Sequence, residues 1–133
     1  MYQKSTRNIS VTVKPTFLDD RSSPADNYYL WAYQVKIENQ GPETVQLRTR
    51  YWRITDAMGR IQEVRGPGVV GEQPILKTGQ AFEYTSATPL STPSGIMMGS
   101  YEMEKLDGGG GETFNVTIPA FSLDSPHEAV RFN

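Results

Sequence analysis

The feature that most restricts the fold is an alternating run of large apolar residues between Asn27 and Asn39. They occupy every second position, as Tyr29, Trp31, Tyr33, Val35 and Ile37. Successive side chains of a β-strand point to opposite faces, so this run gives one apolar face and one more polar face. A helix would place Trp31 and Tyr33 on different sides. The pattern therefore predicts a central strand with one face on the core.

Shorter segments with β character recur along the rest of the chain. In the segment that opens at Val45 and Leu47, the apolar positions change parity before Trp52. This change predicts a β-bulge or burial on both faces. Pro15 follows another alternating segment and predicts an edge or a bend there. The further predicted strands are Ile9–Val13, Ala81–Thr85, Ile96–Leu106 and Phe114–Ile118.

Segments without apolar periodicity separate these strands. We predict loops at Asp19–Asp26 and Thr85–Gly95, and a hairpin tip at Gly108–Gly111. Ala120–Asn133 is predicted to be a tail in which Phe121 and Leu123 could dock on the sheet. About seven or eight short strands without a long helix predict an all-β, immunoglobulin-like sandwich, with a closed barrel as the alternative.

The length and composition narrow the class of protein. A chain of 133 residues fits one domain with its own core. The net charge of −2 gives no global electrostatic reason to expect nucleic-acid binding. The absence of cysteine removes disulfides and thiolate sites. The sequence shows neither a signal peptide nor a membrane-spanning run, so we expect a soluble, cytoplasmic protein that does not bind a membrane.

The segment Tyr51–Pro74 holds the densest unusual chemistry. Tyr51–Thr55 and Arg60–Val64 are predicted to pair as antiparallel strands around a turn at Asp56–Gly59. Several arginines lie in or beside this hairpin. On an unbroken strand Arg48 and Arg50 would share one face, and Arg53 would lie on the other. A solvated face is the default interpretation, and a phosphate or acidic-partner site is the alternative. The arginines are Arg48, Arg50, Arg53, Arg60 and Arg65.

The glycine-rich segment Gly66–Gly71 matches the letters G-x-G-x-x-G, but its context does not fit a dinucleotide-binding fingerprint. Pro67 removes an amide, and Pro74 follows too soon for a long helix. No acidic residue lies between Glu83 and Glu102, where the ribose-binding carboxylate would fall. Two interpretations remain: a tight connection between strands, or a concave nest of amides that holds an anion.

The rest of the chain offers no catalytic constellation. His127 is the single histidine, and the serines have no evident base partner. The carboxylates in the last third of the chain are interpreted as a solvated acidic edge, with weak divalent-cation binding as the alternative. Of Met97 and Met98, adjacent on a strand, at most one is expected in the core, and the other could line a binding surface.

Three segments carry a resemblance to a known family: YWRITDAMGRIQEVRGPGVVGEQPIL, FEYTSATPLSTPSGIMMGSYEM and IPAFSLDSP. In order and spacing they resemble the ApaG family, also called CorD in some bacteria, from about Ile9 to Pro126. The resemblance implies a fibronectin type III-like β-sandwich, with residues 1–133 as a single ApaG domain. It also implies a link to cobalt resistance and magnesium efflux, that is, to divalent-cation homeostasis.

The resemblance supplies no catalytic residue, cofactor or metal ligand, and it implies a protein-interaction role. Our first hypothesis is therefore a noncatalytic module that binds an unknown protein partner near Trp52 and Arg53. The second is a site for phosphate, pyrophosphate or a nucleotide at the glycine-rich segment, as proposed for the family. Its residues would be Arg65, Gly66, Gly68, Val69, Val70 and Gly71. Either a monomer or a homodimer paired through a free strand edge fits the sequence.

Overall fold

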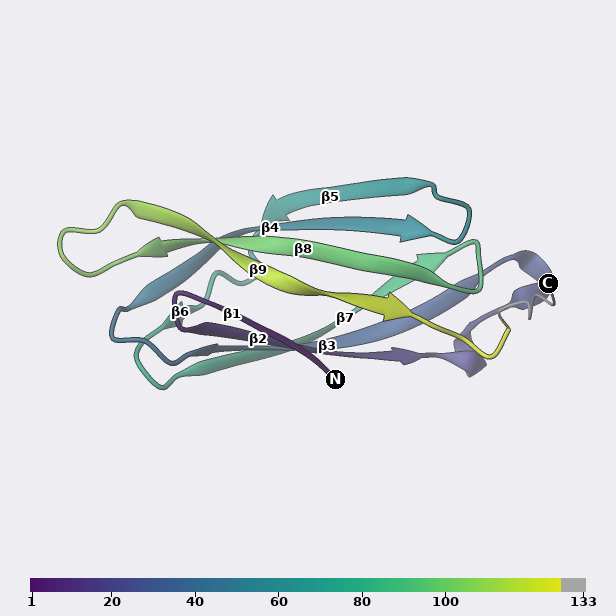
Figure 1. Ribbon diagram of the computed structural model, residues 1–133, viewed down its shortest axis with the longest axis horizontal. Coiled ribbons are helices and arrows are strands. Elements are labelled where there is room, and N and C mark those ends of the chain that lie inside the picture. The colour runs from purple at the N-terminus through teal and green to yellow at the C-terminus, as the bar shows by residue number, and fades with distance from the viewer. Residues whose placement is uncertain (128–133) are drawn as a thin grey trace.

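The computed structural model describes residues 1–127, which form two antiparallel β-sheets packed face to face (Figure 1). One sheet has the order β1-β2-β3-β7. The other has the order β5-β4-β8-β9, and the short β6 also pairs with β4. The strands are β1 (Tyr2–Thr6), β2 (Ile9–Phe17), β3 (Tyr29–Asn39), β4 (Val45–Asp56), β5 (Ile61–Pro67), β6 (Ile75–Leu76), β7 (Ala81–Leu90), β8 (Gly95–Lys105) and β9 (Glu112–Leu123). The predicted sandwich is confirmed, with two sheets in place of a closed barrel.

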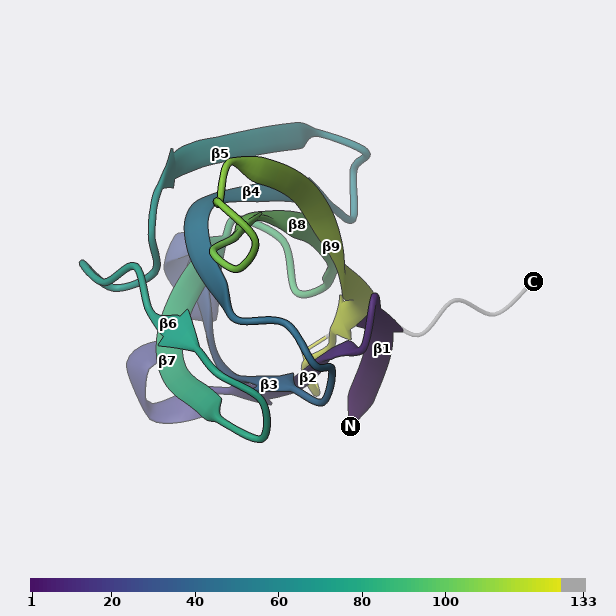
Figure 2. The same ribbon diagram turned by 90° about the vertical axis from the view of Figure 1, so that its left-hand side faces the viewer.

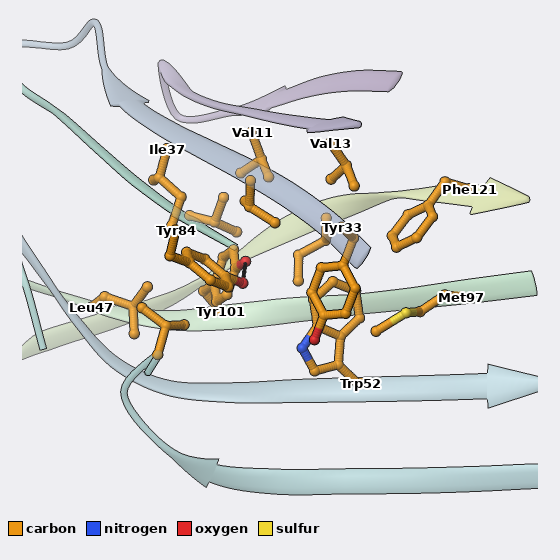
Figure 3. Packing of buried hydrophobic residues seen from close by; sticks show 14 of the residues in the cluster. Val11, Val13, Tyr33, Ile37, Leu47, Trp52, Tyr84, Met97, Tyr101 and Phe121 are labelled. Carbon is orange, nitrogen blue, oxygen red and sulfur yellow. Dashed lines mark hydrogen bonds between the residues drawn. The ribbon is translucent and has the colours of Figure 1, made fainter. Parts of the chain in front are cut away.

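The alternating run from Tyr29 to Ile37 forms β3, as predicted, between β2 and β7. Its apolar side chains are all buried and face the second sheet. Tyr33 packs edge-to-face on Trp52 of β4, with ring centroids 5.3 Å apart, and lies 6.1 Å from the ring of Phe121 in β9 (Figure 3). These contacts between sheets place the centre of the core beneath the middle of β4.

The predicted parity change in β4 is a β-bulge between Leu47 and Thr49. It corrects the expectation for the arginines, which assumed an unbroken strand. Arg50 lies opposite the buried Tyr101 and so belongs to the inner face. Arg48, at the bulge, forms an ion pair of 2.8 Å with Glu104. The bulge therefore separates two side chains that regular alternation would place together.

Three segments differ from their predictions. β1 was not predicted, and it pairs with β2 through a turn at Arg7 and Asn8, both with positive φ. Most of Thr85–Gly95 is strand, because β7 continues to Leu90 and tolerates Pro89 on a free edge. Phe121 and Leu123 are buried residues of β9, not parts of a docked tail. The end of the predicted tail, residues 128–133, lies outside the described residues.

The two long sides of the sandwich are different. On one side β1 lies against β9 (Figure 2). There the Thr117 amide donates to Thr6 Oγ1 at 3.3 Å. The other two outermost strands, β5 and β7, end their sheets as unpaired edges in the described chain. Pro15 lies beyond the end of β1, so its missing amide falls where β2 has no partner on that side. Within residues 1–127, no helix has the length and apolarity to cross a bilayer.

Candidate binding face and glycine turn

The outward-facing side of the second sheet carries exposed apolar residues. Thr55 of β4 pairs with Ile61 of β5 on one side and with Ile96 of β8 on the other. Ile61 is 51% exposed and Ile96 is 49% exposed, and Met98 in the next outward position of β8 is 39% exposed. We call this surface the β4 outer face; its defining residues are Tyr51, Arg53, Ile61, Arg65, Ile96 and Met98.

The outward-facing side of the first sheet has a different composition. Lys14 pairs with Gln34, and Lys36 pairs with Glu83. Within β2, β3 and β7 no large hydrophobic residue is as exposed as those of the β4 outer face. A polar face of this kind is usual for a solvated sheet. Exposed apolar groups gain free energy when they are covered, so the β4 outer face would gain more from a contact than the outward side of the first sheet.

Three polar residues on this face contact one another. The Tyr51 hydroxyl donates a hydrogen bond of 2.6 Å to Glu63 Oε2. The Arg65 guanidinium lies 4.3 Å from the centroid of the Tyr51 ring, in a cation–π contact. Glu63 raises the pKa of the Tyr51 hydroxyl, because the hydrogen bond to the carboxylate favours the protonated phenol. The Arg65 side chain remains 74% exposed, so its charge is available to a ligand.

A shallow hollow adjoins this group at the end of β5. Its lining includes Arg65, Gly66 and Pro67, together with Arg50 and Glu102. Arg50 enters from the inner face of the sheet and donates to the carbonyl oxygens of Pro67 at 2.9 Å and Gly68 at 3.0 Å. Gly66 lies beside the Arg50 guanidinium, where a Cβ atom would come within 3.1 Å of its nitrogens. Arg50 thus holds the chain in place where β5 ends.

The glycine-rich segment forms a tight turn after β5. The Val69 amide donates to the Glu72 carbonyl at 2.8 Å, and the Glu72 amide donates to the Val69 carbonyl at 2.9 Å. The two residues between them, Val70 and Gly71, have φ values of 43° and 81°. Positive φ at both central positions is the geometry of a type I′ turn. The side chain of Val69 is buried and anchors this turn in the core.

The turn limits how this segment could hold an anion. The Gly68 amide donates to the Arg48 carbonyl at 2.9 Å, and the Val69 amide is used within the turn. A Cβ atom at Gly68 would overlap the Glu72 carbonyl, so the turn requires glycine at this position whether or not it binds an anion. No helix follows the segment, since the chain continues into β6. An anion on this turn would therefore depend on Val70, Gly71 and side chains such as Arg65.

Trp52, predicted as a partner-binding residue, is a core residue. Its side chain is 3% exposed and packs edge-to-face on both Tyr33 and Phe121 (Figure 3). The bulge in β4 turns Trp52 inward, so a partner on the outer face cannot reach it. Its neighbour Arg53 points outward and is exposed, opposite Glu63 and Met98. Local sequence patterns could not align Ile61 and Ile96 on either side of Thr55, because that alignment depends on strand order.

The remaining candidate residues separate in the fold. Met97 is buried and Met98 is exposed, as predicted. His127 Nε2 lies 3.0 Å from Asp19 Oδ1, and its ring packs against the rings of Phe17 and Tyr29. Among residues 1–127, no group of three or more histidine and carboxylate side chains is arranged to hold a metal ion.

Comparisons with known proteins place these features in a wider context. The model of a family described as the ApaG domain matches residues 19–105. A protein named Protein ApaG from Paramagnetospirillum magneticum is 65% identical over 133 residues and covers 100% of both chains. Another Protein ApaG, from Parvibaculum lavamentivorans, is 65% identical over 127 residues, which cover 96% of this chain and 95% of the relative. A crystal structure of a Bordetella pertussis protein superposes with a TM-score of 0.83 and 42% identity, covering 95% of this chain and 97% of that one.

Proposed function

The chain belongs to the ApaG family, and from this we propose that it is a noncatalytic module whose β4 outer face binds a protein partner. The observation that carries the proposal is the asymmetry between the two outward-facing sides of the sandwich. The β4 outer face exposes Ile61, Ile96 and Met98, whereas the corresponding strands of the other sheet expose polar side chains. A connection with cobalt resistance and magnesium efflux would then act through the partner.

The composition of the face indicates what kind of partner fits. Ile96 and Met98 supply adaptable apolar contact area on β8, and Arg53 and Arg65 supply guanidinium groups with several donors each. Interfaces are typically enriched in methionine, aromatic residues and arginine. A partner with an apolar strip flanked by carboxylates would complement this arrangement. Such a partner would contact Arg53 directly and leave Trp52 in the core.

Photocrosslinking tests this proposal. A photoreactive phenylalanine analogue at position 98 should give a discrete covalent product with one protein in cells that make this chain. The same analogue at position 36, on the outward side of the other sheet, is the matched control and should not give that product. Adding Arg53→Glu should abolish the product at position 98. Equal products from both positions, or a product unaffected by Arg53→Glu, would contradict the proposal.

A second candidate function is binding of phosphate or pyrophosphate at Arg65 and the turn from Gly66 to Gly71. The observation that favours it is the exposed Arg65 guanidinium beside the hollow at the end of β5. Calorimetric titration with pyrophosphate should show saturable binding that Arg65→Gln weakens at least tenfold and that Arg65→Lys weakens less, since lysine keeps the charge but loses the planar fork. Parallel titrations with Mg²⁺ and Co²⁺ test weak cation binding.

The choice of variant matters for that experiment. Gly68→Val is unsuitable, because a side chain there would overlap the Glu72 carbonyl and disturb the turn itself. Gly71→Ala places its Cβ in open space, so its only expected cost is the strain of a side chain at positive φ. Heats that do not saturate, or binding that is identical in Arg65→Gln, would leave the segment as a structural connection only.

A further inference from the structure

We propose that two copies of this chain pair through β5, antiparallel and about a two-fold axis at Val64, to form one continuous sheet. β5 ends the β5-β4-β8-β9 sheet, and most of its residues are exposed. This inference concerns the strand edge, so it goes beyond the partner proposed for the β4 outer face and does not depend on it.

The backbone of β5 has free hydrogen-bonding groups along its outer edge. The Asp56 amide donates to the Arg60 carbonyl at 3.0 Å, which fixes the phase of the β4–β5 ladder. In an antiparallel pair, hydrogen-bonded and non-hydrogen-bonded positions alternate. Gln62, Val64 and Gly66 therefore direct their peptide groups toward β4. Ile61, Glu63 and Arg65 direct theirs away from the sheet, where an added strand would bind.

The side chains on this edge complement themselves. Pairing about Val64 places Glu63 of one copy opposite Arg65 of the second copy, and the symmetry generates the same pair again. Glu63 and Arg65 are both exposed, and within one chain their closest charged atoms are 3.8 Å apart. Opposite charges on directly facing strand positions stabilise the pairing. In the same register, Glu63 of one copy and Arg65 of the second copy form a hydrogen-bonded pair. This agrees with the outward direction of their peptide groups.

The other free edge lacks this property. β7 carries Glu83 as its single charged residue, and Pro89 removes one of its amides. Two copies of β7 would therefore gain no pair of opposite charges in any antiparallel register. The charges therefore favour β5 over β7 as the dimer edge. The positions of Glu63 and Arg65 also specify the register in which two copies of β5 pair.

Charge exchange tests the proposal. Sedimentation velocity across a concentration series should show the wild-type chain approaching twice its 14.9 kDa mass. Glu63→Arg alone or Arg65→Glu alone would place like charges opposite each other and should weaken association at least tenfold. The double variant with both changes should restore it, because the opposite charges then face each other in reverse. Circular dichroism checks that each variant is folded.

A cysteine experiment tests the register. The chain contains no cysteine, so a single introduced thiol reports one position. Val64→Cys brings two copies of the residue together in a non-hydrogen-bonded pair about 4.5 Å apart at Cα, within the range for a disulfide. Gln62→Cys is the control on the same edge, because its two copies would be roughly 13 Å apart along the strands.

Oxidation should cross-link the Val64→Cys variant at least tenfold faster than the Gln62→Cys variant. A wild-type chain that stays monomeric at every concentration overturns the proposal. So does a dimer that withstands both single charge reversals, or one in which the two cysteine variants cross-link equally.

Discussion

The hydroxyl groups of Tyr84 and Tyr101 share a hydrogen bond in the interior of the sandwich, although the two residues come from different sheets (Figure 3). Tyr84 lies in β7 and Tyr101 in β8, and both side chains are buried in the core. Burial raises the pKa of both hydroxyl groups above the usual value, because the phenolate would lose its hydration. This polar contact joins the two sheets across the interior of the sandwich.

We predict that the tyrosine pair makes the fold sensitive to alkali. Unfolded tyrosines lose their protons above about pH 10, whereas the folded pair keeps them, so the free energy of unfolding should fall as pH rises. The decrease should approach about 1.4 kcal/mol per pH unit for each tyrosine. Thermal unfolding between pH 8 and about pH 11.5 should show a shallower decrease when both Tyr84 and Tyr101 are changed to Phe. The exposed Tyr28→Phe is the control; a slope that is unchanged in the double variant would contradict the prediction.

The two glycines of the turn after β5 should differ in their tolerance of alanine. Both have positive φ, 61° at Gly68 and 81° at Gly71. Gly71→Ala should cost about 1 kcal/mol, from backbone strain alone, since no atom lies within 4 Å of its added Cβ. Gly68→Ala should cost more than about 2 kcal/mol, because its Cβ also overlaps the Glu72 carbonyl. Urea unfolding of the two variants measures the difference, and equal losses would argue against this account of the turn.

Val70 should be replaceable with a gain in stability. It is a β-branched residue at φ 43°, a conformation that asparagine adopts more readily. Val70→Asn would give the Asn-Gly pair that type I′ turns prefer and should raise the free energy of unfolding by about 1 kcal/mol. Val70→Thr keeps the branched Cβ and should not stabilise the protein. Equal unfolding midpoints for the asparagine and threonine variants would show that this strain is absent.

Asp56 should stabilise the β4–β5 hairpin mainly through its backbone contacts. Its Oδ1 atom accepts hydrogen bonds from the Met58 amide at 2.9 Å and the Arg60 amide at 3.0 Å, and Oδ2 accepts from Arg60 Nε at 2.7 Å. Asp56→Ala removes all three and should cost roughly 1–2 kcal/mol. Asp56→Asn keeps the Oδ1 acceptor and should cost about half as much. Denaturant unfolding would contradict this view if the two variants lost equal stability.

The elements that the sequence predicted well are those whose own residues determine them. β3 follows from the alternation of Tyr29 to Ile37, and the β4–β5 hairpin follows from the turn chemistry of Asp56 and Gly59. The bulge near Arg48 was also predictable, since Leu47 and Trp52 have opposite parity. In each case the period of the side chains and the local turn residues carry enough information.

Other features depend on partners that are distant in the sequence. β1 has little apolar character, and its turn uses Arg7 and Asn8 at positive φ without a glycine to mark it. Pro89 is uncommon in a strand, and it is tolerated because β7 is an edge. The inward direction of Trp52 could have been inferred from the bulge. The alignment of Ile61 with Ile96 required the order of three strands, which local patterns do not contain.

The bulge in β4 has a consequence for how the length of this strand can vary. Odd-numbered residues are buried before the bulge and even-numbered residues are buried after it. Arg48 is the extra residue that allows both sets to face the core. Deleting Arg48 itself would leave a regular ladder in which Trp52 and Ile54 still face the core, whereas deleting a residue between Arg50 and Trp52 would turn the apolar residues on one side of the deletion toward solvent. Within β4, a single-residue deletion should therefore be tolerated only at the bulge, so that this is the one position where the strand can shorten without exposing part of the core.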